Sequence, residues 1–125
     1  MPLVLYAGGL IAIDRLDRNV GAILRVAQRE KMPVQTSAAV VAQVWRSRSN
    51  QANLARVLTG IDVESLAMQT GRSVGEVLAL SRTADVVDGH LGFIVRSGDT
   101  VLTSDTNDIK KILRARGVRA TLRRV

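Results

Sequence analysis

The chain has 125 residues, 46% of them hydrophobic, and contains no cysteine. This length and composition predict a single domain over residues 1–125 and exclude a disordered chain, disulfides, a thiol nucleophile and a thiolate metal site. No apolar run approaches the roughly 20 residues needed to span a bilayer, and the start lacks the basic region and cleavage site of a signal peptide. We therefore expect a cytoplasmic protein with no membrane partner.

The formal net charge of +7 comes entirely from the end of the chain. Residues 1–108 carry 11 Lys or Arg and 11 Asp or Glu, whereas residues 109–125 carry seven Lys or Arg and no acid. This basic segment is a candidate contact for a polyanion such as RNA, and a solvated terminal helix face explains it equally well. Aromatic residues are limited to Tyr6, Trp45 and Phe93, which disfavours RNA recognition by base stacking.

The first half of the chain alternates strand and helix patterns. Leu3-Val4-Leu5 reads as a buried strand, and the paired glycines 8 and 9 lead through a tight turn into a short helix. Further elements expected here are a helix containing Val20, Ile23, Leu24 and Ala27, a strand at 34–36, a helix at 38–46 capped by Thr36 or Ser37, and a helix at 50–58.

The second half continues this alternation. The patterns predict a strand at 61–66, a helix at 67–80, a helix at 85–96 entered through Asp85, a strand at 100–103, a helix containing Ile109, Ile112 and Leu113, and a strand at 118–122. Alternating strands and helices predict a mainly parallel sheet covered by helices on both faces. Right-handed crossovers then place the carboxyl ends of the strands at one edge, where α/β proteins bind ligands.

Two acidic groups fall at this edge. Asp85 and Asp88 lie near the start of one helix, and Asp105 and Asp108 follow the strand at 100–103. Carboxylate clusters of this kind suit Mg²⁺ or Mn²⁺, which can support phosphodiester cleavage. Asp85 and Asp105 are also ordinary helix N-cap residues.

The remaining candidates have simpler explanations. A lone histidine such as His90 is more often a core or surface residue than a ligand, and Trp45 fits a packing or interface position. The Gly8-Gly9 pair matches neither of the two common nucleotide-binding glycine patterns.

Over essentially its whole length the chain resembles the PIN-domain family, specifically the VapC-like toxins of toxin–antitoxin modules. The residues that carry this resemblance are Val4-Leu5-Tyr6-Ala7-Gly8-Gly9-Leu10-Ile11-Ala12, Ala39-Val40-Val41-Ala42-Gln43-Val44-Trp45-Arg46, Asp85-Val86-Val87-Asp88-Gly89-His90 and Val101-Leu102-Thr103-Ser104-Asp105. The resemblance implies a PIN-like three-layer α/β sandwich, a Mg²⁺- or Mn²⁺-dependent endoribonuclease, an RNA substrate, a homodimer and a cognate antitoxin that wraps the active groove.

The family's acidic site carries over only in part. The resemblance assigns its late-helix aspartate to Asp88, with Asp85 as an additional acid, and its strand-four aspartate to Asp105. The first-strand aspartate falls at Tyr6 and the helix-three glutamate at Gln43, both of them uncharged near neutral pH. The loss of two ligand charges should weaken Mg²⁺ binding, and the remaining acids should repel one another until the pKa of at least one rises.

The sequence therefore predicts a ribonuclease whose catalytic and metal-binding residues would be Asp85, Asp88 and Asp105, impaired or inactive because of Tyr6 and Gln43. The alternative is a catalytically dead pseudo-nuclease that binds RNA or the antitoxin. A third possibility is a subunit whose dimer surface, including Trp45 and the helix at 50–58, is its remaining use.

Overall fold

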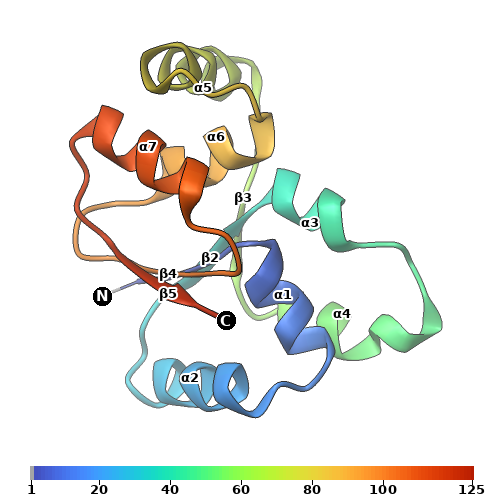
Figure 1. Ribbon diagram of the computed structural model, residues 1–125. Helices are drawn as coiled ribbons and strands as arrows, with labels where there is room; N and C mark the ends of the chain where they lie inside the picture. The colour runs from blue at the N-terminus through green and yellow to red at the C-terminus, as the bar shows by residue number, and fades with distance from the viewer. Residues whose placement is uncertain (1) are drawn as a thin grey trace.

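The computed structural model describes residues 2–125, which fold around one five-stranded sheet (Figure 1). Its strands are β1 (Leu3–Leu5), β2 (Val34–Ser37), β3 (Asp62–Glu64), β4 (Thr100–Thr103) and β5 (Thr121–Arg124). They lie in the order β3-β2-β1-β4-β5, and every neighbouring pair is parallel. The parallel sheet expected from the alternating pattern is confirmed.

Helices cover both faces of this sheet. They are α1 (Ala7–Asp14), α2 (Arg18–Arg29), α3 (Ala38–Val44), α4 (Ala52–Leu58), α5 (Met68–Ser81), α6 (Val86–Ile94) and α7 (Asn107–Arg116), with a short 3₁₀ turn, η1, at Ser49–Gln51. Helices α5, α6 and α7 gather on one side, and α1, α2 and α4 lie on the other (Figure 1). The result is the expected three-layer, PIN-like α/β sandwich. No helix among residues 2–125 has the length and apolar character needed to cross a membrane.

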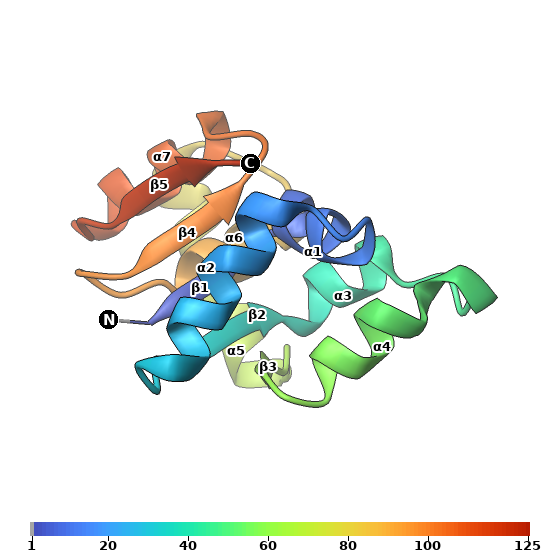
Figure 2. The same cartoon turned by 90° about the horizontal axis from the view of Figure 1, so that it is seen from below.

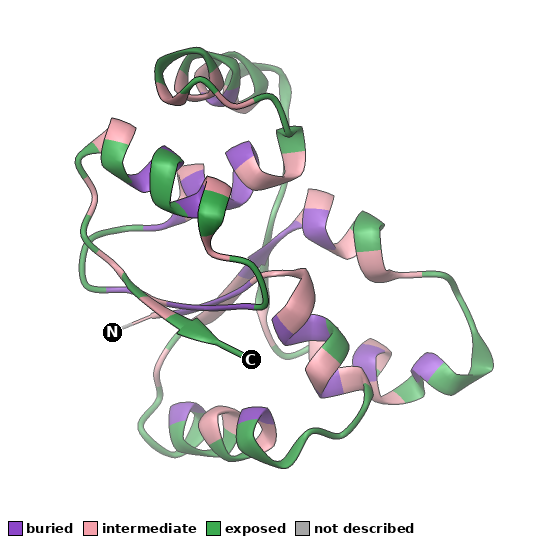
Figure 3. Ribbon diagram, viewed as in Figure 1, coloured by how far each residue is buried: buried purple, intermediate pink, exposed green. Residues whose placement is uncertain are grey.

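The core is centred on the two middle strands. Val4 and Leu5 of β1 and Val101 and Leu102 of β4 are fully buried, because helices pack on both faces of these strands. The outermost strands are mostly exposed, as Figure 3 shows for β5. The fold therefore holds the carboxyl ends of β1 and β4 rigidly side by side.

Several element boundaries differ from those expected. Helix α3 ends at Val44 instead of residue 46, since Trp45 is extended and the buried Gln51 side chain accepts the N–H of Arg46 at 2.9 Å. The third strand is shorter, at Asp62–Glu64 instead of 61–66. Local propensity alone does not fix where the tertiary contacts end an element.

The last strand is Thr121–Arg124 instead of 118–122, because the end of α7 uses the preceding residues. Gly117 adopts the left-handed conformation, with φ of 67°, and the N–H of Val118 donates to Leu113 O at 2.9 Å. This C-cap closes the helix and delays pairing with β4 until Thr121, whose N–H donates to Asp99 O.

Candidate functional site

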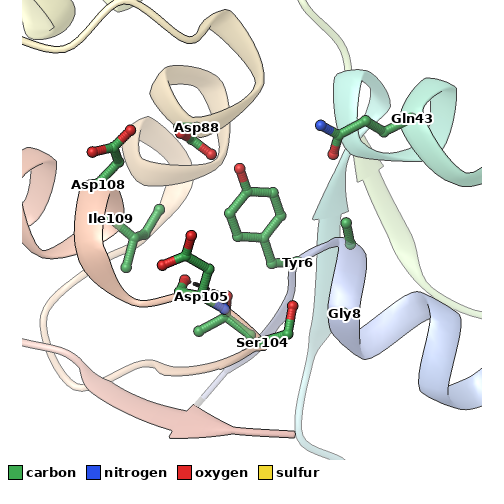
Figure 4. A pocket seen from close by; sticks show the side chains of 10 residues that line it. Tyr6, Gly8, Gln43, Asp88, Ser104, Asp105, Asp108 and Ile109 are labelled. Carbon is green, nitrogen blue, oxygen red and sulfur yellow. Dashed lines mark hydrogen bonds between the residues drawn. The ribbon is translucent and has the colours of Figure 1, made fainter.

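A pocket of about 180 Å³ opens at the carboxyl ends of β1 and β4 (Figure 4). Five segments line it: the turn from β1 into α1, helix α3, helix α6, the end of β4 and the first turn of α7. The lining residues are Tyr6, Ala7, Gly8, Gln43, Asp88, Thr103, Ser104, Asp105, Asp108 and Ile109. The pocket is therefore at the sheet edge where α/β folds bind ligands.

Tyr6 is placed by the backbone of the two central strands. Its N–H donates to Leu102 O at 3.0 Å, and its carbonyl accepts the N–H of Leu10 at 3.1 Å, so the residue ends β1 and begins α1. The side chain is half-buried, and its ring stands in the pocket between Gln43 and the aspartates (Figure 4). A neutral phenol thus stands in the middle of an otherwise acidic site.

Gly8 allows α1 to approach the end of β4 closely. A Cβ at this position would lie 2.7 Å from Ser104 Oγ and 2.8 Å from Ser104 N. Because the backbone nitrogen cannot move aside as a flexible side chain can, only glycine fits this contact.

The end of β4 is held in a tight turn by its own polar side chains. Thr103 Oγ1 donates to Asp105 O at 2.7 Å and accepts the Asp105 N–H at 3.2 Å. The Asp105 carboxylate accepts the N–H of Asn107 at 3.0 Å. Asp105 therefore both lines the pocket and stabilises the turn into α7.

Asp88 faces two other carboxylates. Burial is the main reason that its pKa rises to about 6 from an ordinary 3.8, followed by the charge of Asp108, a hydrogen bond with Asp108 and the charge of Asp105. The expectation that at least one acid would have a raised pKa is confirmed. Burial, and after it the neighbouring carboxylates, therefore keep the Asp88 carboxyl protonated to a higher pH than an ordinary aspartate.

Asp85 does not join these acids. It is exposed, it does not line the pocket, and its carboxylate accepts the N–H of Asp88 at 2.9 Å as the N-cap of α6. Asp108 takes the third place instead. The i, i+3 spacing from Asp105 was the sequence signal for Asp108, whereas no pattern pointed to Ile109 or Ser104.

His90 is a buried structural residue, as its simpler explanation predicted. It is fully buried, its Nδ1 shares a hydrogen bond of 2.6 Å with Ser37 Oγ, and burial lowers the pKa of its ring. Ser37 also caps α3 by accepting the Ala39 N–H at 3.0 Å. This contact joins the start of α3, which carries Gln43, to α6, which carries Asp88.

The structure does not bring Asp85, Asp88 and Asp105 together in the way that the sequence suggested for binding Mg²⁺ or Mn²⁺. Within residues 2–125, no three His, Asp or Glu side chains are grouped so that they could hold a metal ion. Asp85, one of the three proposed metal ligands, does not line the pocket with Asp88 and Asp105, because its carboxylate caps its own helix. Metal binding by Asp88 and Asp105 stays a prediction. Gln43 and Tyr6 add no charge to replace that of Asp85 (Figure 4).

Comparison with known proteins gives a match in structure alone. No protein-family model matches the chain, and no curated protein matches it. Among solved structures, a chain in the complex of VapBC2 from Rickettsia felis bound to a DNA fragment from its promoter matches with a TM-score of 0.68 and 15% sequence identity. The match covers 100% of this chain and 99% of that chain. At this identity the likeness shows a shared fold over the full length.

Proposed function

We propose that this protein is a VapC-like member of a toxin–antitoxin pair in which Mg²⁺- or Mn²⁺-dependent RNA cleavage is strongly impaired or absent. The observation that supports this proposal is the pocket itself. It lies at the functional edge of a PIN-like fold and holds Asp88, Asp105 and Asp108, yet the Tyr6 ring stands among them. The site has the ancestry of a nuclease without its full set of charges.

The remaining role in this proposal is binding. A pocket with three carboxylates attracts a cationic side chain. Among residues 2–125 the one ion pair of these acids is the exposed contact between Asp108 and Lys111 at 3.9 Å, which leaves Asp88 and Asp105 without a basic partner. A basic side chain from an antitoxin would relieve their repulsion. The antitoxin partner is further supported by the fold shared with a chain of the VapBC2 complex.

The metal part of the proposal is tested by restoring the two acids. We expect no saturable Mn²⁺ binding by calorimetry and no RNA cleavage for the protein as it is. The Tyr6→Asp, Gln43→Glu variant should bind Mn²⁺ and cleave RNA, with cleavage abolished by a chelator. Tyr6→Phe is the matched control, since it restores no carboxylate.

Two results would contradict the proposal. Chelator-sensitive RNA cleavage by the unmodified protein at a rate similar to that of the double variant would show that the site is not impaired. A double variant that binds Mn²⁺ but cleaves no RNA would contradict the inference that this site derives from a nuclease. The partner is tested separately, by co-purification with the product of any small reading frame immediately upstream, and Asp88→Lys should weaken that complex.

A further inference from the structure

A second groove runs along the outer edge of the sheet, between α7 and the segment leading into β5. Its volume is about 430 Å³. Figure 2 shows β5 as the outermost strand with α7 beside it. None of the residues that line this groove lines the aspartate pocket, so the two surfaces are separate.

The floor of the groove is apolar. Leu113 is 5% exposed, and the half-buried Val118 and Leu122 pack against the core while leaving part of their surface in the groove. The backbone beneath is fixed, since the N–H of Gly98 donates to Arg119 O at 2.9 Å and the N–H of Arg119 donates to Ser97 Oγ at 3.2 Å. The groove therefore has a defined shape.

Three exposed cations form its rim, namely Lys110, Arg114 and Arg119. The one ion pair within 4.0 Å among residues 2–125 joins Lys111 to Asp108, so the rim cations have no acidic partner in the described part of the chain. The helix dipole favours Arg114 in the last turn of α7 but does not account for the other two.

The neighbouring Arg116 shows what a structural arginine does in this helix. It turns inward, donates to Gly92 O at 2.6 Å and to Val95 O at 2.7 Å, and stacks over Phe93. The rim cations make no such contacts.

The edge of β5 also has free hydrogen-bonding groups. The N–H of Thr121 donates to Asp99 O, just before β4, at 2.9 Å, and the N–H of Val125 donates to Thr103 O of β4 at 3.0 Å. Because backbone groups alternate along a strand, those of Leu122 and Arg124 face outward. No strand among residues 2–125 pairs with this edge. Arg123 and Arg124 lie on β5 itself, where charged side chains discourage unwanted strand pairing. The rim cations lie outside the strand, so this protective role does not account for them.

From these features we infer that the groove binds a short extended segment of a partner protein in which apolar residues at the centre are flanked by acidic residues at both ends. Its backbone adds to the edge of β5, so that every second side chain faces the groove. The central apolar side chains cover Leu113 and Leu122, and the acidic side chains at the ends reach the rim cations. The side chains between them face Arg123, on the opposite face of the strand. RNA fits less well, since no aromatic side chain lines the groove. This inference does not depend on the proposed function.

The test uses fluorescence anisotropy with a labelled peptide of about ten residues that has valines at its centre and glutamates at both ends. We expect saturable binding that weakens at least about tenfold in the variant Lys110→Gln, Arg114→Gln, Arg119→Gln, as three lost ion pairs of modest strength require. The matched control removes the same charge elsewhere, through Arg15→Gln, Arg18→Gln and Arg72→Gln, and should change binding less than about twofold. Circular dichroism checks that both variants are folded.

Strand addition is tested with the same peptide N-methylated at every second amide, which should not bind when the methyl groups face β5. Equal binding by both N-methylated registers and the parent peptide would overturn strand addition. Equal weakening by the two triple variants would overturn the site, because it would reveal non-specific charge attraction. Groove-dependent binding of an oligouridylate in preference to the peptide would assign the groove to RNA.

Discussion

Helix α7 separates two surfaces of opposite character. Asp108 and Ile109, in its first turn, face the aspartate pocket, whereas Lys110 and Arg114 face the groove beside β5. Carboxylates in the pocket crowd one another in a partly dry space, and Asp88 responds with a raised pKa. The groove cations stand apart in water, where charge costs little.

The pocket and the groove differ in how closely neighbouring atoms constrain each residue. Side chains and backbone around the pocket contact each other at short range, so a substitution there should alter stability. Groove side chains have few partners within the chain, so a substitution there should alter binding instead. We therefore expect the effects of substitutions on stability to decrease from the pocket to the groove.

The closest packing at the pocket should be the most sensitive. Gly8→Ala places a Cβ 2.8 Å from Ser104 N and should lower the free energy of unfolding by about 3 kcal/mol. Gly71→Ala is the control, because no atom lies within 4 Å of its Cβ, and alanine should stabilise α5 by about 0.5–1 kcal/mol. Urea unfolding measures both. An unchanged free energy of unfolding for Gly8→Ala would mean that the backbone at Ser104 can move aside to accommodate the added Cβ.

The contact that joins α3 to α6 should come next. Ser37→Ala removes the hydrogen bond to the buried His90 ring and the N-cap of α3, at an expected cost of about 2 kcal/mol. Ser73→Ala on α5 is the control and should change unfolding by less than about 0.5 kcal/mol. Equal stability of the two variants in urea would show that the Ser37–His90 contact contributes nothing.

Asp88 gives a prediction with a pH dependence. Because folding raises its pKa from 3.8 to about 6, the folded protein holds the proton more tightly than the unfolded chain does. The resulting stability is complete below about pH 4 and is lost as the pH rises through 6. Asp88→Asn lacks this loss and should be more stable than the unmodified protein above pH 6, by about 1 kcal/mol after allowance for solvent screening.

The measurement for Asp88 is urea unfolding from pH 4 to pH 8. Asp85→Asn is its control, since asparagine caps a helix about as well as aspartate. A gain in stability for Asp88→Asn that is the same at every pH would contradict the explanation by a raised pKa of Asp88.

Charge removal at the groove should affect stability least. Lys110→Gln with Arg119→Gln should change the free energy of unfolding by less than about 0.5 kcal/mol, because neither side chain has an acidic partner. Thermal unfolding at low and high salt is the check. A larger loss that disappears at high salt would show that these cations stabilise the fold and would weaken the contrast with the pocket.

Much of the fold followed from local patterns. The local patterns predicted five strands, each of which overlaps a strand of the structure, and the position of Asp85 ahead of Val86 predicted the start of α6. The ends of α3 and β5 could not be predicted, because Gln51 ends one and the turn after Gly117 delays the other. Both depend on hydrogen bonds that a pattern of hydrophobicity does not encode.

Part of the candidate site could also be predicted. Parallel topology alone brings Asp88 and Asp105 to one edge of the sheet, and the structure places them in one pocket with Tyr6 and Gln43. The exchange of Asp85 for Asp108 could not be predicted. Two acids three residues apart share a helix face only if both lie within the helix, and Asp85 caps α6 instead.

Composition and local pattern were enough to predict the α/β class and the sheet edge at which ligands are expected, and to place the excess charge in residues 109–125. Which acids meet, how strongly Asp88 holds its proton, and which cations beside β5 have no acidic partner depend on the tertiary structure. Hydrophobic periodicity and turn residues act over a few neighbours in the chain. Side-chain charges act through space, between segments that are distant in sequence.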